Sequence, residues 1–140
     1  MFLSEYLHTV DGKGRIAIPA RFRAKIESGA VLTRGIEQCL YVYTLETLER
    51  KAAAVEAAAE LTPEQRRRVG HKMYSQAHEV ELDAQGRILI PLKLRKYAEI
   101  GGEAVIVGAR DRFEVWGAER WQAYADELES ADLSSLPLPF

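Results

Sequence analysis

The chain has 140 residues, of which 19 are Lys or Arg and 21 are Asp or Glu, so its formal net charge is −2. Hydrophobic residues make up 47% of the chain and charged residues 29%, which is the composition of an ordinary globular protein. These values exclude a disordered acidic tail, a collagen-like chain and a uniformly basic nucleic-acid coat protein. A single domain of this length can bury roughly 68–70% of its unfolded surface.

Cysteine content and hydropathy indicate the compartment. Cys39 is the one cysteine, so no internal disulfide can form, and a lone thiol is typical of a reducing cytosol. No stretch approaches the roughly 18 apolar residues of a membrane span, and the first residues lack the basic and apolar regions of a secretory signal. We therefore expect a soluble cytoplasmic protein that does not associate with a membrane.

The N-terminal segment is predicted to be mainly β. Residues 5–10 form an expected strand that leads into a turn, and together with residues 15–18 they make a hairpin. Residues 15–18 alternate with period two, which places Ile16 and Ile18 on one face of a strand. Pro19 suits the first position of a short helix, where its missing N–H is not needed.

The short helix is expected to end at Ser28-Gly29, and two short strands follow at 30–34 and 39–43. Apolar residues at intervals of three and four over 45–59 then predict an amphipathic helix. Thr62-Pro63-Glu64-Gln65 has the pattern of a capping box and begins a second helix.

The second half of the chain repeats the first. Residues 10–23 read VDGKGRIAIPARFR and residues 82–95 read LDAQGRILIPLKLR, with seven of 14 positions identical. The similarity continues more weakly into two later strands, where Leu40-Tyr41-Val42-Tyr43 aligns with Phe113-Glu114-Val115-Trp116. A unit of about 45 residues therefore occurs twice. The expected organisation is unit 1 at 5–48, a helical linker at 49–76, unit 2 at 77–121, and the end of a C-terminal helix with a tail at 122–140.

The size of this unit has a structural consequence. A unit of about 45 residues without a disulfide or a metal is at the edge of independent stability. We therefore expect the two units to pack together as a pseudo-two-fold pair, in an α+β fold that is mainly β with flanking helices. In unit 2, Gly101-Gly102 is expected to end the short helix. The apolar stripes of the longer helices must also be buried, which predicts a higher oligomer.

Each unit contains the spacing Asp-x-x-Gly-Arg. An Asp at the start of a tight turn can accept backbone N–H bonds, a Gly tolerates positive φ, and an Arg brings a planar set of five donors. Two interpretations remain open: the Asp and Arg stabilise their own hairpin or pair with the partner hairpin, or the Arg contacts phosphates or guanine edges at a loop tip. The turn and pairing residues are Asp11, Gly14, Asp83 and Gly86.

Charge is distributed unevenly along the chain. Residues 1–25 carry a net charge of +3, whereas residues 111–140 carry −5. A basic loop flanked by glycine can approach a phosphate backbone, and the alternative is an ordinary solvated surface. The run Arg66-Arg67-Arg68 is interpreted as a solvated helix face, with DNA contact as the less favoured alternative. The candidate DNA contacts are Lys13, Arg15, Arg21, Arg23 and Arg87.

Enzymatic function finds no support in the sequence. Gly12-x-Gly14 lacks the third glycine and the strand–helix context of a dinucleotide-binding motif. His71 and His78 are seven residues apart and Cys39 is remote, so no metal-ligand spacing is present. We predict no catalytic residue, no metal site and no cofactor.

The two copies of Asp-x-x-Gly-Arg-Ile-x-Ile-Pro, 72 residues apart, resemble the duplicated motif of the MraZ family of bacterial transcriptional regulators. The resemblance covers residues 1–130, including the Met-Phe-x-Ser-Glu-Tyr start. It implies two AbrB-like swapped-hairpin β-barrel units. Lys13 has no counterpart in the second loop, where Ala84-Gln85 stands, and this favours unit 1 as the half that faces DNA.

The resemblance also implies a function. It suggests a sequence-specific DNA-binding regulator, mainly a repressor, of a cell-division and cell-wall gene cluster that includes its own promoter. Such a protein would bind short direct repeats in double-stranded promoter DNA as a homo-oligomeric ring of about eight to twelve subunits, and would associate with the nucleoid. The alternative is an assembly protein of the same fold whose ring binds another protein.

Overall fold

The structure is a computed structural model that describes residues 1–140. Its eight strands are β1 Glu5–Thr9, β2 Arg15–Ala17, β3 Ala30–Arg34, β4 Leu40–Tyr43, β5 His78–Val80, β6 Arg87–Leu89, β7 Glu103–Gly108 and β8 Phe113–Gly117. The helices are α1 Ala20–Arg23, the 3-10 helix η1 Ala24–Ile26, α2 Leu45–Ala57, α3 Pro63–Tyr74, α4 Leu92–Tyr97 and α5 Ala118–Ser130.

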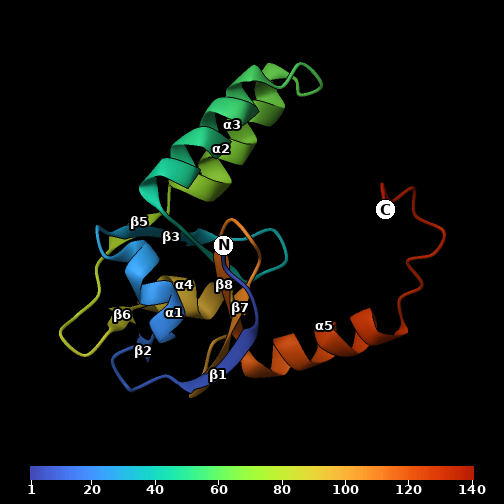
Figure 1. The fold of residues 1–140 in the computed structure, drawn as a ribbon. Coiled ribbons are helices and arrows are strands. Elements are labelled where there is room, and N and C mark those ends of the chain that lie inside the picture. Colours follow the sequence, from blue (N-terminus) through green and yellow to red (C-terminus); the bar gives the residue numbers. More distant parts are fainter.

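The two repeats are interlaced through one antiparallel sheet. The six-stranded sheet has the order β1-β7-β8-β4-β3-β5, and β2 and β6 form a separate two-stranded antiparallel ribbon. The first strand of each repeat pairs with the other repeat, since β1 lies against β7 and β5 lies against β3. The strands form one β body (Figure 1) in which neither repeat has a complete sheet of its own.

The strand order has pseudo-two-fold symmetry, because exchanging the two repeats reverses the list without changing it. The register locates the axis at two places. Tyr41 of β4 lies opposite Glu114 of β8, and Ile16 of β2 lies opposite Ile88 of β6. In each case the facing residues occupy equivalent positions in the two repeats. The predicted α+β fold is thus confirmed, and the repeats pack as a pseudo-two-fold pair.

The structure corrects the expected hairpin. β1 forms its ladder with β7, and the segment before β2 keeps only an isolated bridge between Val10 and Ile16. The hairpin opens because β1 pairs along all five of its residues with β7 of the other repeat, whereas β2 has only three residues.

Two helix boundaries also differ from the prediction. Pro19 precedes α1 as its N-cap, with an extended ψ of 138°, and does not occupy the first helical position. Helix α4 ends at Tyr97, before Gly101-Gly102, and the left-handed residue after it is Glu99, with φ 54°. The predicted capping box on α3 is confirmed by both bonds, from Gln65 N to the Thr62 hydroxyl and from Thr62 N to the Gln65 side chain.

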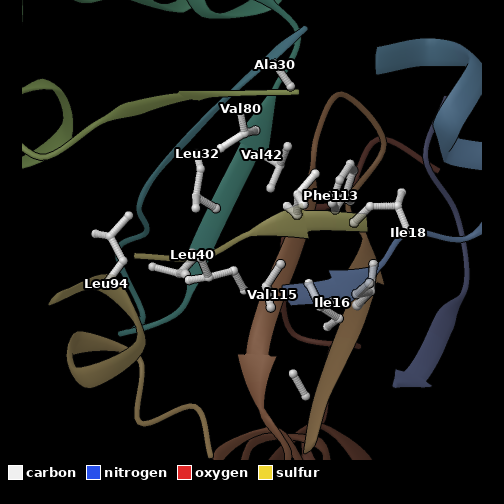
Figure 2. Packing of buried hydrophobic residues seen from close by; sticks show 14 of the residues in the cluster. Ile16, Ile18, Ala30, Leu32, Leu40, Val42, Val80, Leu94, Phe113 and Val115 are labelled. Atoms are coloured by element: carbon white, nitrogen blue, oxygen red, sulfur yellow. The ribbon is translucent and has the colours of Figure 1, made fainter. Parts of the chain in front are cut away.

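One apolar core lies between the six-stranded sheet, the ribbon and the short helices (Figure 2). Phe22 of α1 stacks on Phe113 of β8 with ring centroids 5.2 Å apart. Leu94 of α4 occupies the equivalent place in the second repeat and is fully buried. The isoleucines of the ribbon and of the segments after it are also buried: Ile16, Ile18, Ile88 and Ile90.

The opposite face of the sheet carries a smaller cluster of Cys39, Tyr41, Tyr43 and Trp116. It is partly covered by Leu48 and Met73 of the α2–α3 hairpin and by Trp121 and Tyr124 of α5. The α2–α3 hairpin and α5 project from the β body in different directions, and the C-terminal tail extends beyond α5 (Figure 1). These helices therefore expose surface that the chain itself does not cover.

Two leucines of α4 provide a matched test of the core. We expect Leu94→Ala to lower the free energy of unfolding by about 2–5 kcal/mol, because it removes a fully buried side chain and leaves a cavity. Leu92→Ala makes the same change at an exposed position of the same helix and should have little effect. Urea denaturation measures both variants, and equal losses would contradict this arrangement of the core.

Candidate nucleic-acid interface

The β2–β6 ribbon has one buried face and one open face. Ile16 and Ile88 face each other and point into the core, so the flanking pairs must point outward. The outward pairs are Arg15 opposite Leu89 and Ala17 opposite Arg87. The open face therefore carries two arginines, one from each repeat, on adjacent strands.

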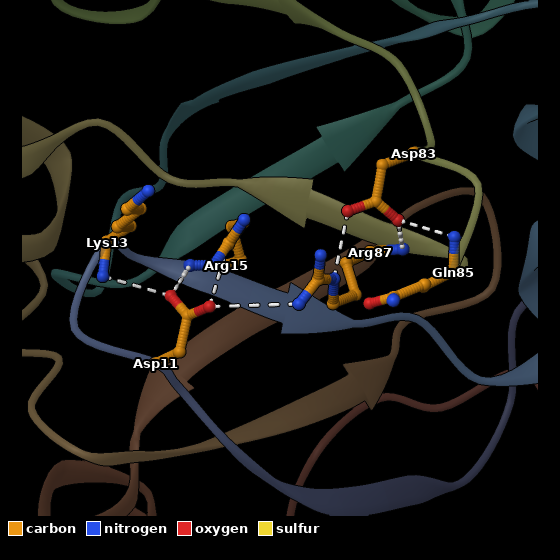
Figure 3. Close-up of polar contacts among 6 residues, drawn as sticks. All are labelled: Asp11, Lys13, Arg15, Asp83, Gln85 and Arg87. Atoms are coloured by element: carbon orange, nitrogen blue, oxygen red, sulfur yellow. Dashed lines mark hydrogen bonds and ion pairs between the residues drawn. The ribbon is translucent and has the colours of Figure 1, made fainter.

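The turn before β2 is organised by the Asp11 carboxylate. Its Oδ1 accepts the backbone N–H groups of Lys13 at 3.0 Å and of Arg15 at 2.9 Å, and its Oδ2 accepts Arg15 Nε at 2.7 Å (Figure 3). Gly14 completes the turn with φ 89°, a conformation that side-chain-bearing residues rarely adopt. The Lys13 side chain is left exposed at the tip.

The turn before β6 has the same geometry. Asp83 accepts the backbone N–H groups of Gln85 and Arg87 and the Nε of Arg87, each at 2.9 Å (Figure 3). Gly86 has φ 76°. The repeat in the sequence is thus a repeat of one hydrogen-bonded turn that fixes the start of an arginine-bearing strand.

A contact between the repeats breaks the symmetry of this site. Arg87 Nη1 lies 3.8 Å from Asp11 Oδ2, so the Asp11 carboxylate contacts the arginines of both repeats (Figure 3). No equivalent ion pair joins Arg15 to Asp83. Arg87 is consequently held by two carboxylates, whereas Arg15 is held by one.

Hydrogen bonding keeps both carboxylates ionised. The pKa of Asp11 is lowered to about 2, chiefly by the backbone N–H of Arg15, with further contributions from the Arg15 side chain and the Lys13 backbone. The pKa of Asp83 is lowered in the same way, first by the backbone N–H of Arg87. The turns therefore stay charged and ordered at any physiological pH.

A second pair of arginines, Arg23 and Arg95, packs against the two turns, although the sequence suggested Arg23 as a DNA contact. Arg23 donates its Nε to Ile18 O at 2.7 Å, and a Cβ atom added to Gly86 would lie 2.6 Å from that Nε. Arg95 makes the reciprocal contacts with Ile90 O and Gly14. Each glycine thus admits an arginine of the other repeat, and the alignment of Arg23 with Arg95 was the signal for it.

The predicted DNA contacts fall into different environments. Lys13 lies at an exposed loop tip and Arg15 is half-buried on the open face of the ribbon. Arg21 is exposed on α1, whereas Arg23 is occupied by its contact with Gly86. Of the basic run on α3, Arg66 donates to Ala58 O at 2.7 Å and closes the α2–α3 hairpin.

No three His, Cys, Asp or Glu side chains gather as a metal site would require. No helix is long and apolar enough to cross a bilayer.

Fold and site together define a class of protein. Two diverged copies of a strand-exchanging β unit, fused in one chain, present a two-stranded ribbon with an Asp-anchored arginine on each strand. Ribbons of this kind have the dimensions that enter the major groove of DNA.

Comparison with known proteins identifies the family within this class. A family model described as "MraZ protein, putative antitoxin-like" matches residues 1–70 and 73–137. The chain is 45% identical over 130 residues to "Transcriptional regulator MraZ" of Roseiflexus sp. (strain RS-1), covering 93% of this chain and 90% of that protein. It is 42% identical over 135 residues to the protein of that name from Desulfitobacterium hafniense (strain DSM 10664 / DCB-2), covering 96% and 94%. The chain belongs to the MraZ family.

The lowered pKa of Asp11 yields a pH prediction. An Asp with a depressed folded-state pKa adds stability above its unfolded value near 3.8, and this contribution is lost as the pH falls through about 2. We expect the amide resonances of Lys13 and Arg15, both donors to Asp11, to stay constant from neutral pH to about pH 4 and to shift below it. NMR titration measures this, and a shift with a midpoint above pH 4 would contradict the assigned hydrogen bonds.

Proposed function

We propose that this protein is a sequence-specific DNA-binding transcriptional regulator whose DNA contact is the open face of the β2–β6 ribbon together with the loop that carries Lys13. The observation that carries the proposal is the pair of Asp-anchored arginines on adjacent strands, Arg15 and Arg87. An arginine held by a carboxylate at its Nε keeps its outer N–H groups in a fixed direction, which suits bidentate contact with a guanine edge or a phosphate.

The first repeat is proposed as the principal DNA-facing half. Its loop carries Lys13, whereas the second loop has the neutral Gln85. Arg15 has one carboxylate partner and Arg87 has two, so Arg15 is the more available cation. Arg23 is a secondary candidate because its guanidinium already packs on Gly86. Arg21 is a secondary candidate because it lies on α1, outside the ribbon.

Oligomerisation supplies the affinity that one subunit lacks. A single ribbon makes few phosphate contacts, and these weaken steeply as salt rises. Several subunits on repeated sites gain avidity through effective concentration. We therefore propose that a ring of about eight to twelve subunits binds short direct repeats in promoter DNA.

The helices support an oligomer. Between the α2–α3 hairpin and the sheet lies an open apolar groove of 340 Å³, lined by residues that include Tyr43, Leu48, Val55 and Met73. Helix α3 carries four Lys or Arg and one Glu, whereas α5 carries one Arg and four Asp or Glu. An acidic helix of one subunit and a basic helix of another are complementary in charge, and their apolar faces would be covered together.

The proposed regulator is mainly a repressor of a cell-division and cell-wall gene cluster that includes its own promoter, and it acts in the cytoplasm in association with the nucleoid. No cofactor or catalytic residue is part of this proposal. The alternative is an assembly protein whose ring binds another protein, and a mobility-shift assay on the DNA upstream of its own coding sequence separates the two. Binding that weakens with salt supports the regulator.

Arg15→Ala should abolish binding to that upstream DNA while leaving the oligomer mass unchanged, because the side chain faces outward from the ribbon. Arg110→Ala is the matched control, since Arg110 is exposed on the turn between β7 and β8, where it pairs with Asp111, and should keep full binding. Mobility shift over a salt series and light scattering measure both. Retained binding with an unchanged salt slope would refute the role of Arg15.

Arg87→Ala should act first on the structure. It leaves Asp83 without its arginine and removes the link between Asp11 and the second repeat. We expect a lower denaturation midpoint or a disturbed oligomer mass, with weaker DNA binding as a consequence. A stable oligomer of normal mass that no longer binds DNA would show instead that Arg87 is a direct contact.

A further inference from the structure

The open face of the ribbon is not symmetric. Near the first turn it carries Arg15 beside Leu89, and near the second turn it carries Arg87 beside Ala17. Leu89 and Ala17 occupy equivalent positions in the two repeats. One end of the ribbon therefore combines a large apolar side chain with Arg15 and Lys13, whereas the other combines a methyl group with Arg87 and Gln85.

Leu89 differs from the other large apolar residues of its segment. It is 52% exposed and lies directly opposite Arg15 on the open face of the ribbon. Leu89 does not contribute to the core, because the buried residues of this segment are its neighbours Ile88 and Ile90. On the face proposed to meet DNA, an apolar side chain beside the Arg15 guanidinium suits a partner that presents an apolar group beside hydrogen-bond acceptors or negative charge.

Double-stranded DNA presents that combination in the major groove. The C5-methyl group of thymine is the main apolar feature of that groove, and it lies within reach of phosphates and of acceptor atoms of guanine. A two-stranded ribbon fits the groove with one face toward the base edges. The side chains of that face here are Arg15, Ala17, Arg87 and Leu89.

We propose that Leu89 contacts the C5-methyl group of a thymine in the major groove, next to the base or phosphate contacted by Arg15. The inference rests on the proposed DNA-binding function and assigns a specificity-determining residue within it. It also gives each subunit a direction on the DNA, because the apolar end of the ribbon has no equivalent at the other end. A subunit that binds DNA in one orientation suits DNA sites that are repeated head to tail.

The test replaces thymine by uracil, which pairs identically but lacks the methyl group. The probe is a duplex from upstream of the protein's own coding sequence. It is prepared with thymine throughout, and with uracil in place of thymine at single positions of the region that the bound protein protects from nuclease cleavage. We expect wild-type protein to lose about three- to fivefold in affinity at one or a few uracil positions, the effect of removing one buried methyl group. Leu89→Ala should bind the thymine probe more weakly by a similar factor and should no longer distinguish thymine from uracil.

Leu92→Ala is the matched control, because it truncates another exposed leucine outside the ribbon and should keep the discrimination. Light scattering and urea denaturation accompany both variants, and a changed oligomer mass for Leu89→Ala would overturn the inference by placing Leu89 between subunits. Equal binding of both probes by wild type, or discrimination retained by Leu89→Ala, would overturn it while leaving DNA binding intact. Failure of wild type to bind the thymine probe at low salt would refute the proposed function itself.

Discussion

Exchange of strands between the two repeats is the constraint on which the rest of the structure depends. β1 completes its ladder only on β7, and β5 only on β3, so neither repeat can form its sheet alone. The turns obey the same rule, because Ile18 N donates to Gly86 O at 2.9 Å and Ile90 N donates to Gly14 O at 2.8 Å. Each Asp/Arg turn is therefore held in place by the other repeat, and the ribbon exists only in the paired state.

This dependence explains why glycine and arginine recur together in the motif. Gly14 and Gly86 adopt positive φ, and each also lies against a guanidinium, of Arg95 and Arg23 respectively. A residue with a side chain at either position would have to adopt an unfavourable positive φ and would also clash with the guanidinium. Arg23 and Arg95 thus stabilise the turns, whereas Arg15 and Arg87 are presented by them, and the two kinds of arginine cannot be told apart by charge.

Much of the secondary structure and the repeated turn could be predicted from the sequence, because these features depend on residues that are close together in the chain. The strands, the capping box at Thr62 and the repeated turn follow from spacing over a few residues. The partner of each strand was not accessible, since two nearly equivalent repeats offer each strand two similar partners. The link from Asp11 to Arg87 and the contact of Arg23 with Gly86 depend on that choice, so the spacing within one repeat does not specify them.

Fusion of the repeats also permits residues that a symmetric dimer could not tolerate. A residue on a true two-fold axis faces its own copy, so a glutamate there would place two carboxylates together. Here Glu114 lies on the pseudo-axis opposite Tyr41 and is only 7% exposed. It accepts Arg112 Nε and Trp116 Nε1, both at 2.9 Å, and the Arg112 guanidinium lies 4.1 Å from the centre of the Tyr41 ring.

The same freedom operates at the open face of the ribbon. In a homodimer the residues at positions 17 and 89 would be identical, and both ends of the ribbon would present the same side chain beside the arginine. The fused chain keeps the arginine at both positions, because the turn requires it, and allows the neighbouring residue to differ. The net charge of −2 reflects a similar division, since an N-terminal segment with a net charge of +3, residues 1–25, and a C-terminal segment with a net charge of −5, residues 111–140, nearly cancel along the chain. Divergence between the two halves therefore gives a pseudo-symmetric scaffold two chemically different ribbon ends and an uneven distribution of charge.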